Sequence, residues 1–390
     1  DAEDVKFSLD RIQAEDSANA QKALYTAIED VTVIDPLTVE LRLSHPLGDL
    51  LFNLAWGDAV IVAPESVEGL KQTPIGTGPF RFEQWVQGDR IDLARYAEYW
   101  GEAPALDQVT FRFISDPTAA FAAMMAQDVD VFSGYPAPEN LPQFEADPRF
   151  NVTIGQSEGE TILAMNNKAA PLDSPEVRAA IAHAIDRRAG IDGAMFGLGE
   201  PIGTHFSPLH PDYLDLTDLS AFDPEESKRR LADAGLSEGL SLSLALPPPS
   251  YARRGGEIIA AQLQNVGIDV QIRNLEWAQW LEQVLRGKDF DLTIISHTEP
   301  FDIGIYARPD YYFQYGKPEF VALMDQVSLS SDPAERTDLL HQAQRMLAED
   351  HVNGFLFQLP FPTVADARIT GLWGNQPTQA NDLTGVRWTE

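Results

Sequence analysis

Apolar positions recur along this chain with two different periods, one typical of helices and one typical of strands. Val5, Leu9 and Ile12 share one face of a predicted helix at the start of the chain, because helical residues three and four positions apart lie on the same side. Residues 28–43 and 81–96 instead alternate between apolar and polar, with turn-forming residues in the middle of each stretch. Each of these two stretches is predicted to form a hairpin with one buried face.

Strands and helices alternate in the rest of the chain. Residues 107–135 have the pattern of a strand, a helix and a strand, which we interpret as a βαβ unit of a parallel sheet. A Gly and Ser loop at 155–160 is expected to lead into a strand from about Thr161. Further helices are predicted at 174–185, 223–235, 255–267, 276–287 and 332–348, and further strands at 241–246, 268–275, 290–295 and 355–360. This alternation predicts the α/β fold class.

The predicted strand at 290–295 is followed by the most suggestive group of side chains. Its residues are apolar or β-branched, as in a strand buried on both faces that ends at about Ser296. His297, Glu299 and Asp302 come next, and a run of tyrosines and phenylalanine follows at 306–315. Ligands of open α/β sheets bind beyond the carboxyl ends of the strands, and polar groups among aromatics suit a small-molecule site. We expect a ligand pocket here; the alternative is an ordinary surface loop.

Composition excludes several classes of function. The chain has 28 Lys and Arg against 60 Asp and Glu, a net charge of −32, and such a field repels nucleic acids and anionic lipid surfaces. Nucleic acid is therefore excluded as a partner. The absence of cysteine excludes disulfides, a thiolate nucleophile and cysteine-ligated metal. No run of 18 apolar residues predicts a membrane span.

Motifs of enzymes and metal sites are weak. Residues 235–239 match GxSxG, but a nucleophile elbow follows a strand and opens a helix, whereas this pentapeptide closes a predicted helix and precedes a strand. His205 and His210 lie in the irregular stretch 201–222, without a clear helix or a third ligand at useful spacing. We therefore predict no metal and no cofactor. With so many acids, a glycosidase-type carboxyl pair stays possible.

One run carries a specific resemblance. Residues 76–101, GTGPFRFEQWVQGDRIDLARYAEYWG, resemble the signature of the family 5 extracellular solute-binding proteins, the dipeptide- and oligopeptide-binding receptors of ABC importers. Four further segments resemble the family pattern in the same order, at 1–12, 129–136, 165–188 and 275–292. The resemblance covers essentially the whole chain and lacks the first strands of the family pattern, which would precede residue 1.

The resemblance implies a fold and a function. The fold is that of periplasmic binding proteins, type II and cluster C like, with two lobes joined by a hinge and a small extra subdomain. It implies the remainder of that subdomain at 1–75, lobe I at 76–160 with 356–390 returning to it, and lobe II at 161–355. The function would be that of a monomeric, periplasmic or extracellular binding protein that delivers a solute to ABC permease subunits and is not an enzyme. A hydrolase acting on a peptide or glycan in the same cleft is the alternative.

The resemblance also suggests binding residues. Glu299 best matches the position of an aspartate that pairs with the ligand's ammonium group in peptide-binding members, with Asp302 as second candidate, and His297 lies in the same stretch. The other predicted contacts are Trp277 and Tyr135 as apolar walls, with Ser133 and Gly134 offering hydroxyl and backbone groups. No arginine precedes Ser296 in the strand to bind a peptide carboxylate, so a peptide, an opine or an amino-acid derivative are all open.

Overall fold

The computed structural model describes residues 1–299, 301–376, 378 and 380–389, and this part of the chain divides into two compact units. Unit 1 comprises Asp1–Ile114, Asp325–Thr337 and Leu383–Trp388. Unit 2 comprises Ser115–Met324, Asp338–Asp382 and the chain end from Thr389. The three-part division into 1–75, 76–160 with 356–390, and 161–355 stays a prediction.

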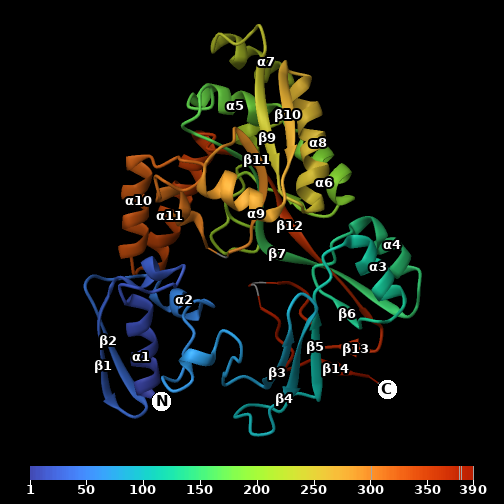
Figure 1. The fold of residues 1–390 in the computed structure, drawn as a ribbon. Coiled ribbons are helices and arrows are strands. Elements are labelled where there is room, and N and C mark those ends of the chain that lie inside the picture. Colours follow the sequence, from blue (N-terminus) through green and yellow to red (C-terminus); the bar gives the residue numbers. More distant parts are fainter. Residues whose placement is uncertain (300, 377, 379, 390) are drawn as a thin grey trace. The chain divides into compact units, whose positions relative to one another are not determined.

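Unit 1 confirms the helix and both hairpins predicted for the start of the chain (Figure 1). Asp1 caps the first helix by accepting a hydrogen bond from the backbone N–H of Glu3, and Leu9 and Ile12 are buried against Tyr25 and Ile28. Its elements are α1 (Ala2–Gln13), η1 (Lys22–Tyr25), β1 (Ile28–Asp35), β2 (Thr38–Leu43), α2 (Leu50–Ala55), η2 (Val67–Gly69), β3 (Phe80–Val86), β4 (Arg90–Arg95) and β5 (Gln108–Arg112).

The predicted βαβ unit at 107–135 is wrong. β5 joins β3 and β4 in a three-stranded antiparallel sheet, whereas β6 (Val131–Phe132) pairs antiparallel with β12 in another sheet. The strand, the helix α3 (Pro117–Met125) and the second strand all lie where the pattern placed them, and only their pairing in one parallel sheet is wrong. Residues 108–112 alternate between exposed and half-buried, which is typical of an antiparallel strand with one solvated face.

Unit 2 is built on a seven-stranded sheet with the order β10-β9-β11-β7-β12-β6, and β8 pairs with β12. The strands are β7 (Phe150–Met165), β8 (Glu200–Pro201), β9 (Leu240–Leu246), β10 (Ile268–Asn274), β11 (Leu292–His297) and β12 (Asn353–Asp366). β9 and β10 pair in parallel, while β7 pairs antiparallel with both β11 and β12. The interior position of β11 confirms a strand buried on both faces.

Helices cover the sheet of unit 2 and provide its core. Residues from four helices and from five strands form one apolar cluster: α5 (Pro175–His183), α6 (Arg187–Met195), α7 (Pro224–Asp233) and α8 (Ser250–Gln264) against β7, β9, β10, β11 and β12. Figure 1 shows α6 and α8 side by side along β9 and β10. The remaining elements of unit 2 are η3 (Pro138–Asn140), α4 (Leu141–Glu145), η4 (Thr217–Ser220), α9 (Trp277–Trp280) with its π-helical continuation (Leu281–Arg286), η6 (Ile303–Ala307) and β13 (Ile369–Thr370). The helices α10 (Pro318–Leu329) and α11 (Pro333–Glu349) have residues in both units, and β14 (Arg387–Trp388) belongs to unit 1.

The loop predicted at 155–160 is also wrong, because these residues belong to the long strand β7. Gly155 is required there for space: a Cβ atom at this position would lie 1.8 Å from the carbonyl oxygen of Gly374. The glycine at position 155, which suggested a loop, is thus explained by the close approach of another backbone to the strand. The predicted lobe boundaries at 160 and 356 fall inside β7 and β12, both of which continue across them.

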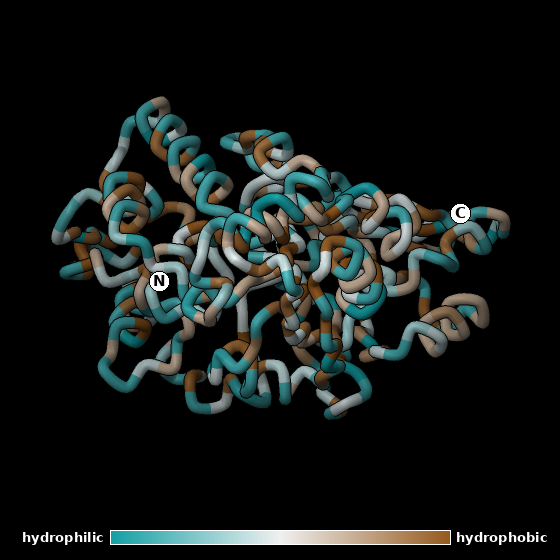
Figure 2. The backbone as a smooth tube through the Cα atoms, turned by 90° about the horizontal axis from the view of Figure 1, so that it is seen from above, coloured by the Kyte–Doolittle hydropathy of each residue, from teal (hydrophilic) through white to brown (hydrophobic). Residues whose placement is uncertain are grey.

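Apolar residues are dispersed along the chain. Figure 2 shows hydrophobic and hydrophilic positions interchanging along the backbone, as the binary pattern of the sequence requires. None of the helices in the described residues is both long and apolar enough to cross a membrane.

The core of unit 2 gives a first prediction. Leu244, in the middle of β9, is fully buried within the apolar cluster. Leu244→Ala leaves a cavity, so we expect the free energy of unfolding to fall by about 3 kcal/mol in urea denaturation followed by circular dichroism. The control, Leu37→Ala at a leucine that is 90 % exposed, should change it by less than about 0.5 kcal/mol. Equal effects of the two substitutions would contradict the assigned core.

Candidate functional site

The candidate site lies beyond the carboxyl end of β11, within unit 2. The strand ends at His297, one residue later than predicted, and its two neighbours in the sheet are β9 and β7. The segment after it forms the short helix η6 and then the aromatic stretch to Tyr315. Residues far apart in the sequence meet here. The irregular segment 202–207 is buried, and His205 within it bonds to Asp302.

Asp302 is the centre of this group. Its Oδ1 accepts a hydrogen bond from Nε2 of His205 at 2.7 Å, and its Oδ2 accepts one from Nδ1 of His297 at 3.1 Å. His205 is fully buried, and His297 nearly so. A buried carboxylate is stable only when donors reach its oxygens, and the two imidazoles supply one donor to each oxygen.

Neighbouring groups assign the proton of His205. The side-chain oxygen of Asn353 accepts from the backbone N–H of Met165 at 3.0 Å, so its amide nitrogen faces Tyr306 and donates to the phenol oxygen at 3.0 Å. The Tyr306 hydroxyl therefore donates to Nδ1 of His205, at 3.0 Å. This leaves the proton of the imidazole on Nε2, where it bonds Asp302.

His297 is held in the same manner. Its Nε2 lies 3.0 Å from the hydroxyl of Tyr312, which is fully buried and donates to this nitrogen. Tyr312 packs in turn on Trp280, whose indole N–H donates to the hydroxyl of Thr293 at 3.0 Å. The orientation of His297 is thus set by the core of the sheet.

Burial and these hydrogen bonds shift the pKa values of Asp302 and His205. Burial alone would raise the pKa of Asp302, but the adjacent imidazoles of His205 and His297 outweigh it and hold this pKa below its ordinary value. Burial lowers the pKa of His205, although Asp302 acts in the opposite direction. The arrangement is one carboxylate between two imidazole donors.

Two acids of β7 that were not predicted join this group. Glu160 lies directly opposite His297 in the antiparallel pair of β7 and β11, and Glu158, two residues earlier, interacts with it electrostatically. Burial is the first cause that raises the pKa of each, and for Glu160 the charges of Asp302 and Glu158 add to it. In the sequence they are two acids, two residues apart, just before an apolar run. They were missed because 155–160 was predicted to be a loop.

Of the predicted contacts, Glu299 and Trp277 are partly accessible. Glu299 is half-buried and accepts from the backbone N–H of Thr298 at 3.1 Å. Trp277 is 44 % exposed and packs edge-on against Trp280, at 6.0 Å between ring centroids. Through Trp280 it adjoins the tyrosine that holds His297. Contact with a ligand stays a prediction for both.

The structure does not bring the other three predicted contacts to this place. Ser133, Gly134 and Tyr135 follow β6, which pairs with β12 at Val364, roughly 20 Å along that strand from Gln358, the residue opposite Glu160. Tyr135 is buried between two phenylalanine rings and has the packing of a core residue. Their ligand contacts stay predictions.

His205, His297 and Asp302 could also hold a metal ion, because their ligand atoms lie within 4.8 Å of one another. A metal at His205 Nε2 would move its proton to Nδ1, facing Tyr306, which already accepts from Asn353. The phenol hydrogen would then lose its acceptor, so the hydrogen-bond directions favour the unmetallated network. His205 does not converge with His210, which stacks on Phe206 at 4.2 Å.

No nucleophile elbow forms at 235–239. Gly235 follows α7 and Gly239 precedes β9, which confirms the reversed order of elements predicted for the GxSxG match. A serine at a nucleophile elbow needs the opposite order, strand and then helix.

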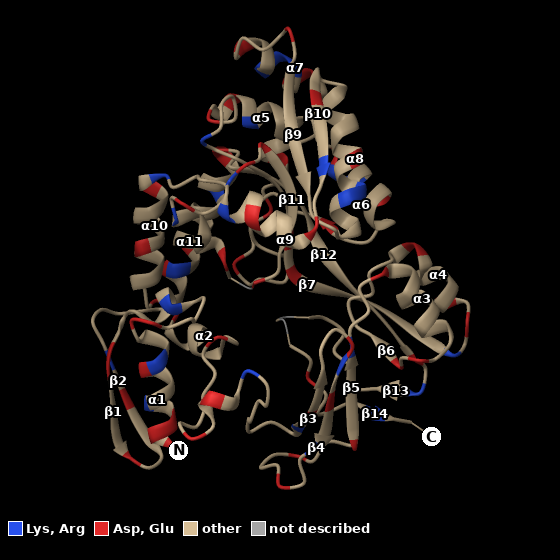
Figure 3. Cartoon of the chain, viewed as in Figure 1, with Lys and Arg blue, Asp and Glu red and all other residues tan. Residues whose placement is uncertain are grey.

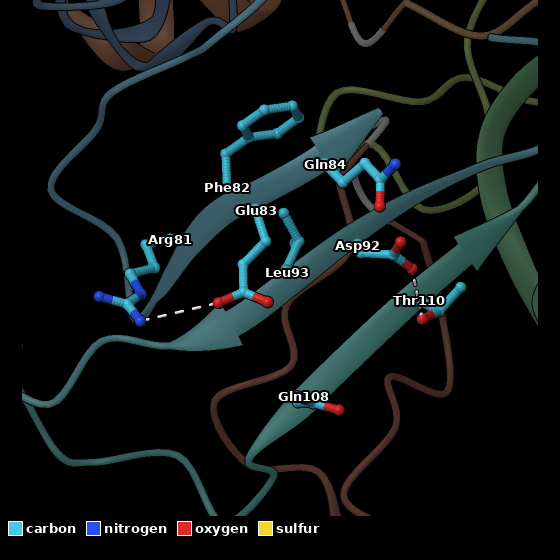
Figure 4. A pocket seen from close by; sticks show the side chains of 8 residues that line it. All are labelled: Arg81, Phe82, Glu83, Gln84, Asp92, Leu93, Gln108 and Thr110. Carbon is cyan, nitrogen blue, oxygen red and sulfur yellow. Dashed lines mark hydrogen bonds and ion pairs between the residues drawn. The ribbon is translucent and has the colours of Figure 1, made fainter. Parts of the chain in front are cut away.

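Unit 1 contains a separate polar pocket of about 650 Å³ on β3, β4 and β5 (Figure 4). Figure 4 shows Arg81 directed at Glu83, with 3.6 Å between their charged atoms, and the hydroxyl of Thr110 bonded to Asp92 at 2.8 Å. The other lining residues are Phe82, Gln84, Leu93 and Gln108. We favour the buried group at β11 as the site, because it lies beyond the carboxyl end of an interior strand, where ligands of open α/β sheets bind.

Acids outnumber basic residues in both units, and they are scattered over helices, strands and loops (Figure 3). The site is therefore embedded in a chain of strongly negative charge. Such a field raises the local concentration of cationic solutes.

Comparison with known proteins relates the chain to a family of solute-binding proteins. The family model described as bacterial extracellular solute-binding proteins, family 5 Middle, matches residues 1–318. The chain is 28 % identical over 317 residues to the dipeptide-binding protein of Escherichia coli (strain K12), which covers 74 % of this chain and 58 % of that protein. The chain thus spans little more than half the length of this curated relative.

Two solved structures show the same fold. The dipeptide-binding protein of Pseudoalteromonas sp. SM9913 in complex with Met-Leu matches with a TM-score of 0.88 and 21 % identity, covering 100 % of this chain and 83 % of that one. The binding protein AgaA of A. tumefaciens R10 in complex with agropinic acid matches with a TM-score of 0.84 and 24 % identity, covering 100 % and 83 %. These matches confirm the predicted two-lobed α/β fold of periplasmic binding proteins.

The state of His205 gives a prediction about pH. Its pKa is lowered in the folded chain, so as the pH falls below about 6.5 the unfolded chain takes up the proton first. The contribution of neutral His205 to stability is complete above that pH and is lost as the pH falls through the lower folded pKa. We expect the urea midpoint to fall between about pH 7 and about pH 5, and to fall less in His205→Gln. His45→Gln, at an exposed histidine, is the control. If the urea midpoint falls equally with pH in wild type and in His205→Gln, the lowered pKa of His205 is contradicted.

Proposed function

The chain belongs to family 5 of the bacterial extracellular solute-binding proteins, and from this premise we propose that it captures a peptide or a related amine-bearing solute for an ABC importer. The observation that carries the proposal is the buried negative charge of Asp302, fixed by His205 and His297 beyond the carboxyl end of β11. A fixed charge that is already desolvated binds a cation without first reorganising.

Glu299 is the proposed direct partner of the solute's ammonium group. Both oxygens of Asp302 are occupied by imidazole donors, whereas Glu299 is more exposed and accepts a hydrogen bond from the adjacent backbone N–H of Thr298. A charge-assisted hydrogen bond from an amine to this carboxylate contributes about 1.5–3 kcal/mol. Asp302 then acts as a second negative charge behind Glu299.

The class of solute is proposed as peptide-like, with opines and amino-acid derivatives as alternatives. The E. coli relative is named for dipeptides, and one structural neighbour was solved with Met-Leu, which supports a peptide. Another neighbour was solved with agropinic acid, so this fold accommodates different solutes. All of these proposals share a nitrogen-bearing solute that the acids at β11 can recognise.

Hinge closure is the proposed mechanism. The predicted lobes at 76–160 and 161–355 would interconvert between open and closed arrangements, and the solute would favour the closed one by touching both. β7 and β12 run across the predicted boundaries, which supports their role as the connection. The closed, monomeric receptor would deliver its solute to permease subunits from the periplasmic or extracellular side of the membrane.

A binding role is favoured over the hydrolase alternative. The family is one of solute-binding proteins, and the comparisons give no support to a hydrolase. Mass spectrometry of the protein after incubation with Met-Leu separates the two classes, because a receptor returns the dipeptide intact and a hydrolase returns methionine and leucine.

Substitution of Glu299 tests the proposed contact. Glu299→Gln keeps the shape and removes the charge, so the affinity for Met-Leu should fall about 10- to 100-fold in calorimetry. The melting temperature without dipeptide should stay close to that of wild type. Glu257→Gln, at an exposed acid on α8, serves as the control and should bind as wild type does. If Glu299→Gln also binds with unchanged affinity, Glu299 is not the anchor.

A further inference from the structure

One buried carboxyl oxygen in the candidate site has no protein partner. Glu160 is 3 % exposed, and its Oε2 is the single carboxyl oxygen among the buried side-chain atoms of the described residues that lack a hydrogen bond. Leaving a buried polar atom unpaired costs about 1–3 kcal/mol. An unpaired group of this kind in a native protein points to a partner that binds from outside the chain.

The direction of Glu160 is set by the sheet. It lies opposite His297 in the antiparallel ladder, so both side chains project from the same face with Cβ atoms about 5 Å apart. The charges of Asp302 and Glu158 act on it, and its own charge raises the pKa of Tyr306. Glu160 therefore faces the group that the proposed function assigns to solute binding.

The surroundings of Glu160 favour its uncharged form in the free protein. Burial raises its pKa well above the ordinary value, and the charges of Asp302 and Glu158 raise it further, while backbone N–H groups of Glu160 and Ser207 act in the opposite direction. Its neighbour His205 is neutral and already donates to Asp302. No cation among these neighbours compensates a charge on Glu160, whereas a cationic solute would.

We propose that Glu160 is a second binding group for the solute: its carboxyl releases a proton to solvent as the solute binds, and the resulting carboxylate accepts a hydrogen bond from a cationic nitrogen of the solute. This inference rests on the function proposed above and extends it. The O–H bond of Glu160 breaks, the proton passes to buffer, and an N–H···O hydrogen bond replaces it. The positive charge of the solute takes the place of the proton.

The exchange restricts the class of solute. A neutral amide in place of the amine brings no charge to balance the carboxylate, so Glu160 keeps its proton and the gain is lost. The site therefore selects solutes with a protonated amine, and an N-acetylated peptide of the same size should bind more weakly. Glu160 is a specificity-determining residue in this sense, in addition to the predicted contact at Glu299.

Calorimetry with Met-Leu in buffers of different ionisation enthalpy tests the proposal. A released proton is taken up by the buffer, so the measured heat of binding must vary with the buffer in proportion to the protons released. We expect wild type to release a fraction of a proton up to one per dipeptide near neutral pH. N-acetyl-Met-Leu should release none.

Glu160→Gln isolates the residue. Glutamine has the shape and neutrality of the protonated acid, so the melting temperature of the free protein should remain near that of wild type. Proton release should disappear, and affinity for Met-Leu should fall about tenfold or more. Glu257→Gln again serves as the matched control, with release and affinity unchanged. Thermal unfolding of each variant confirms that it is folded before binding is compared.

Three results would overturn the inference. Equal affinity and equal proton release in wild type and Glu160→Gln would exclude Glu160 while leaving the proposed function standing, provided that Glu299→Gln still weakens binding. Binding of Ni²⁺ alone, with proton release that Glu160→Gln removes, would assign the carboxyl to a metal site. Failure of wild type to bind Met-Leu would remove the proposed dipeptide function, and this inference with it.

Discussion

A buried carboxylate must be given hydrogen-bond donors, and this requirement at Asp302 organises the candidate site. Its two donors come from separate segments: His297 ends an interior strand, and His205 lies in an irregular segment 97 positions before Asp302. Neither imidazole can turn, because Tyr306 and Tyr312 occupy the distal nitrogens. The need to satisfy one charge therefore explains why the irregular segment 202–207 is buried, although loops usually lie on the surface.

This arrangement has a consequence for binding. Two imidazole donors stabilise the carboxylate of Asp302 in a region from which water is largely excluded. The proposed solute meets Glu299 at the accessible side and Glu160 at the buried side. In this proposal, a single cationic nitrogen replaces water at Glu299 and a proton at Glu160. Burial of Glu160 thus makes binding depend on the charge of the solute.

Local patterns predicted the elements well and their partners less well. Both hairpins, the buried strand β11 and the long helix α11 could be predicted because their periodicity lies in consecutive residues, whereas α10 was not predicted. The βαβ interpretation of 107–135 failed because alternation in β5 does not say which strand it joins. The prediction of a loop at 155–160 was wrong because Gly155 is required by the close approach of the Gly374 backbone, which lies more than 200 positions away in the sequence.

The site shows the same limit. Asp302, Glu299 and His297 could be proposed from sequence, since they follow one buried strand and match a family position. The partnership of His205 with Asp302, and the presence of Glu160 opposite His297, depend on long-range packing and strand register, which composition and spacing do not encode. His205 was visible in the sequence as one of two histidines in an irregular stretch, but its expected companion, His210, stacks on Phe206 instead.

The tautomers of the two imidazoles test the central claim most directly. Nitrogen NMR of the isotope-labelled protein, with the signals assigned through His205→Gln and His297→Gln, reports which ring nitrogen of each histidine carries a proton. At neutral pH we expect His205 to be protonated on Nε2 alone and His297 on Nδ1 alone, each directed at Asp302. Protons found instead on Nδ1 of His205 and Nε2 of His297, facing the tyrosines, would contradict the carboxylate held between two donors.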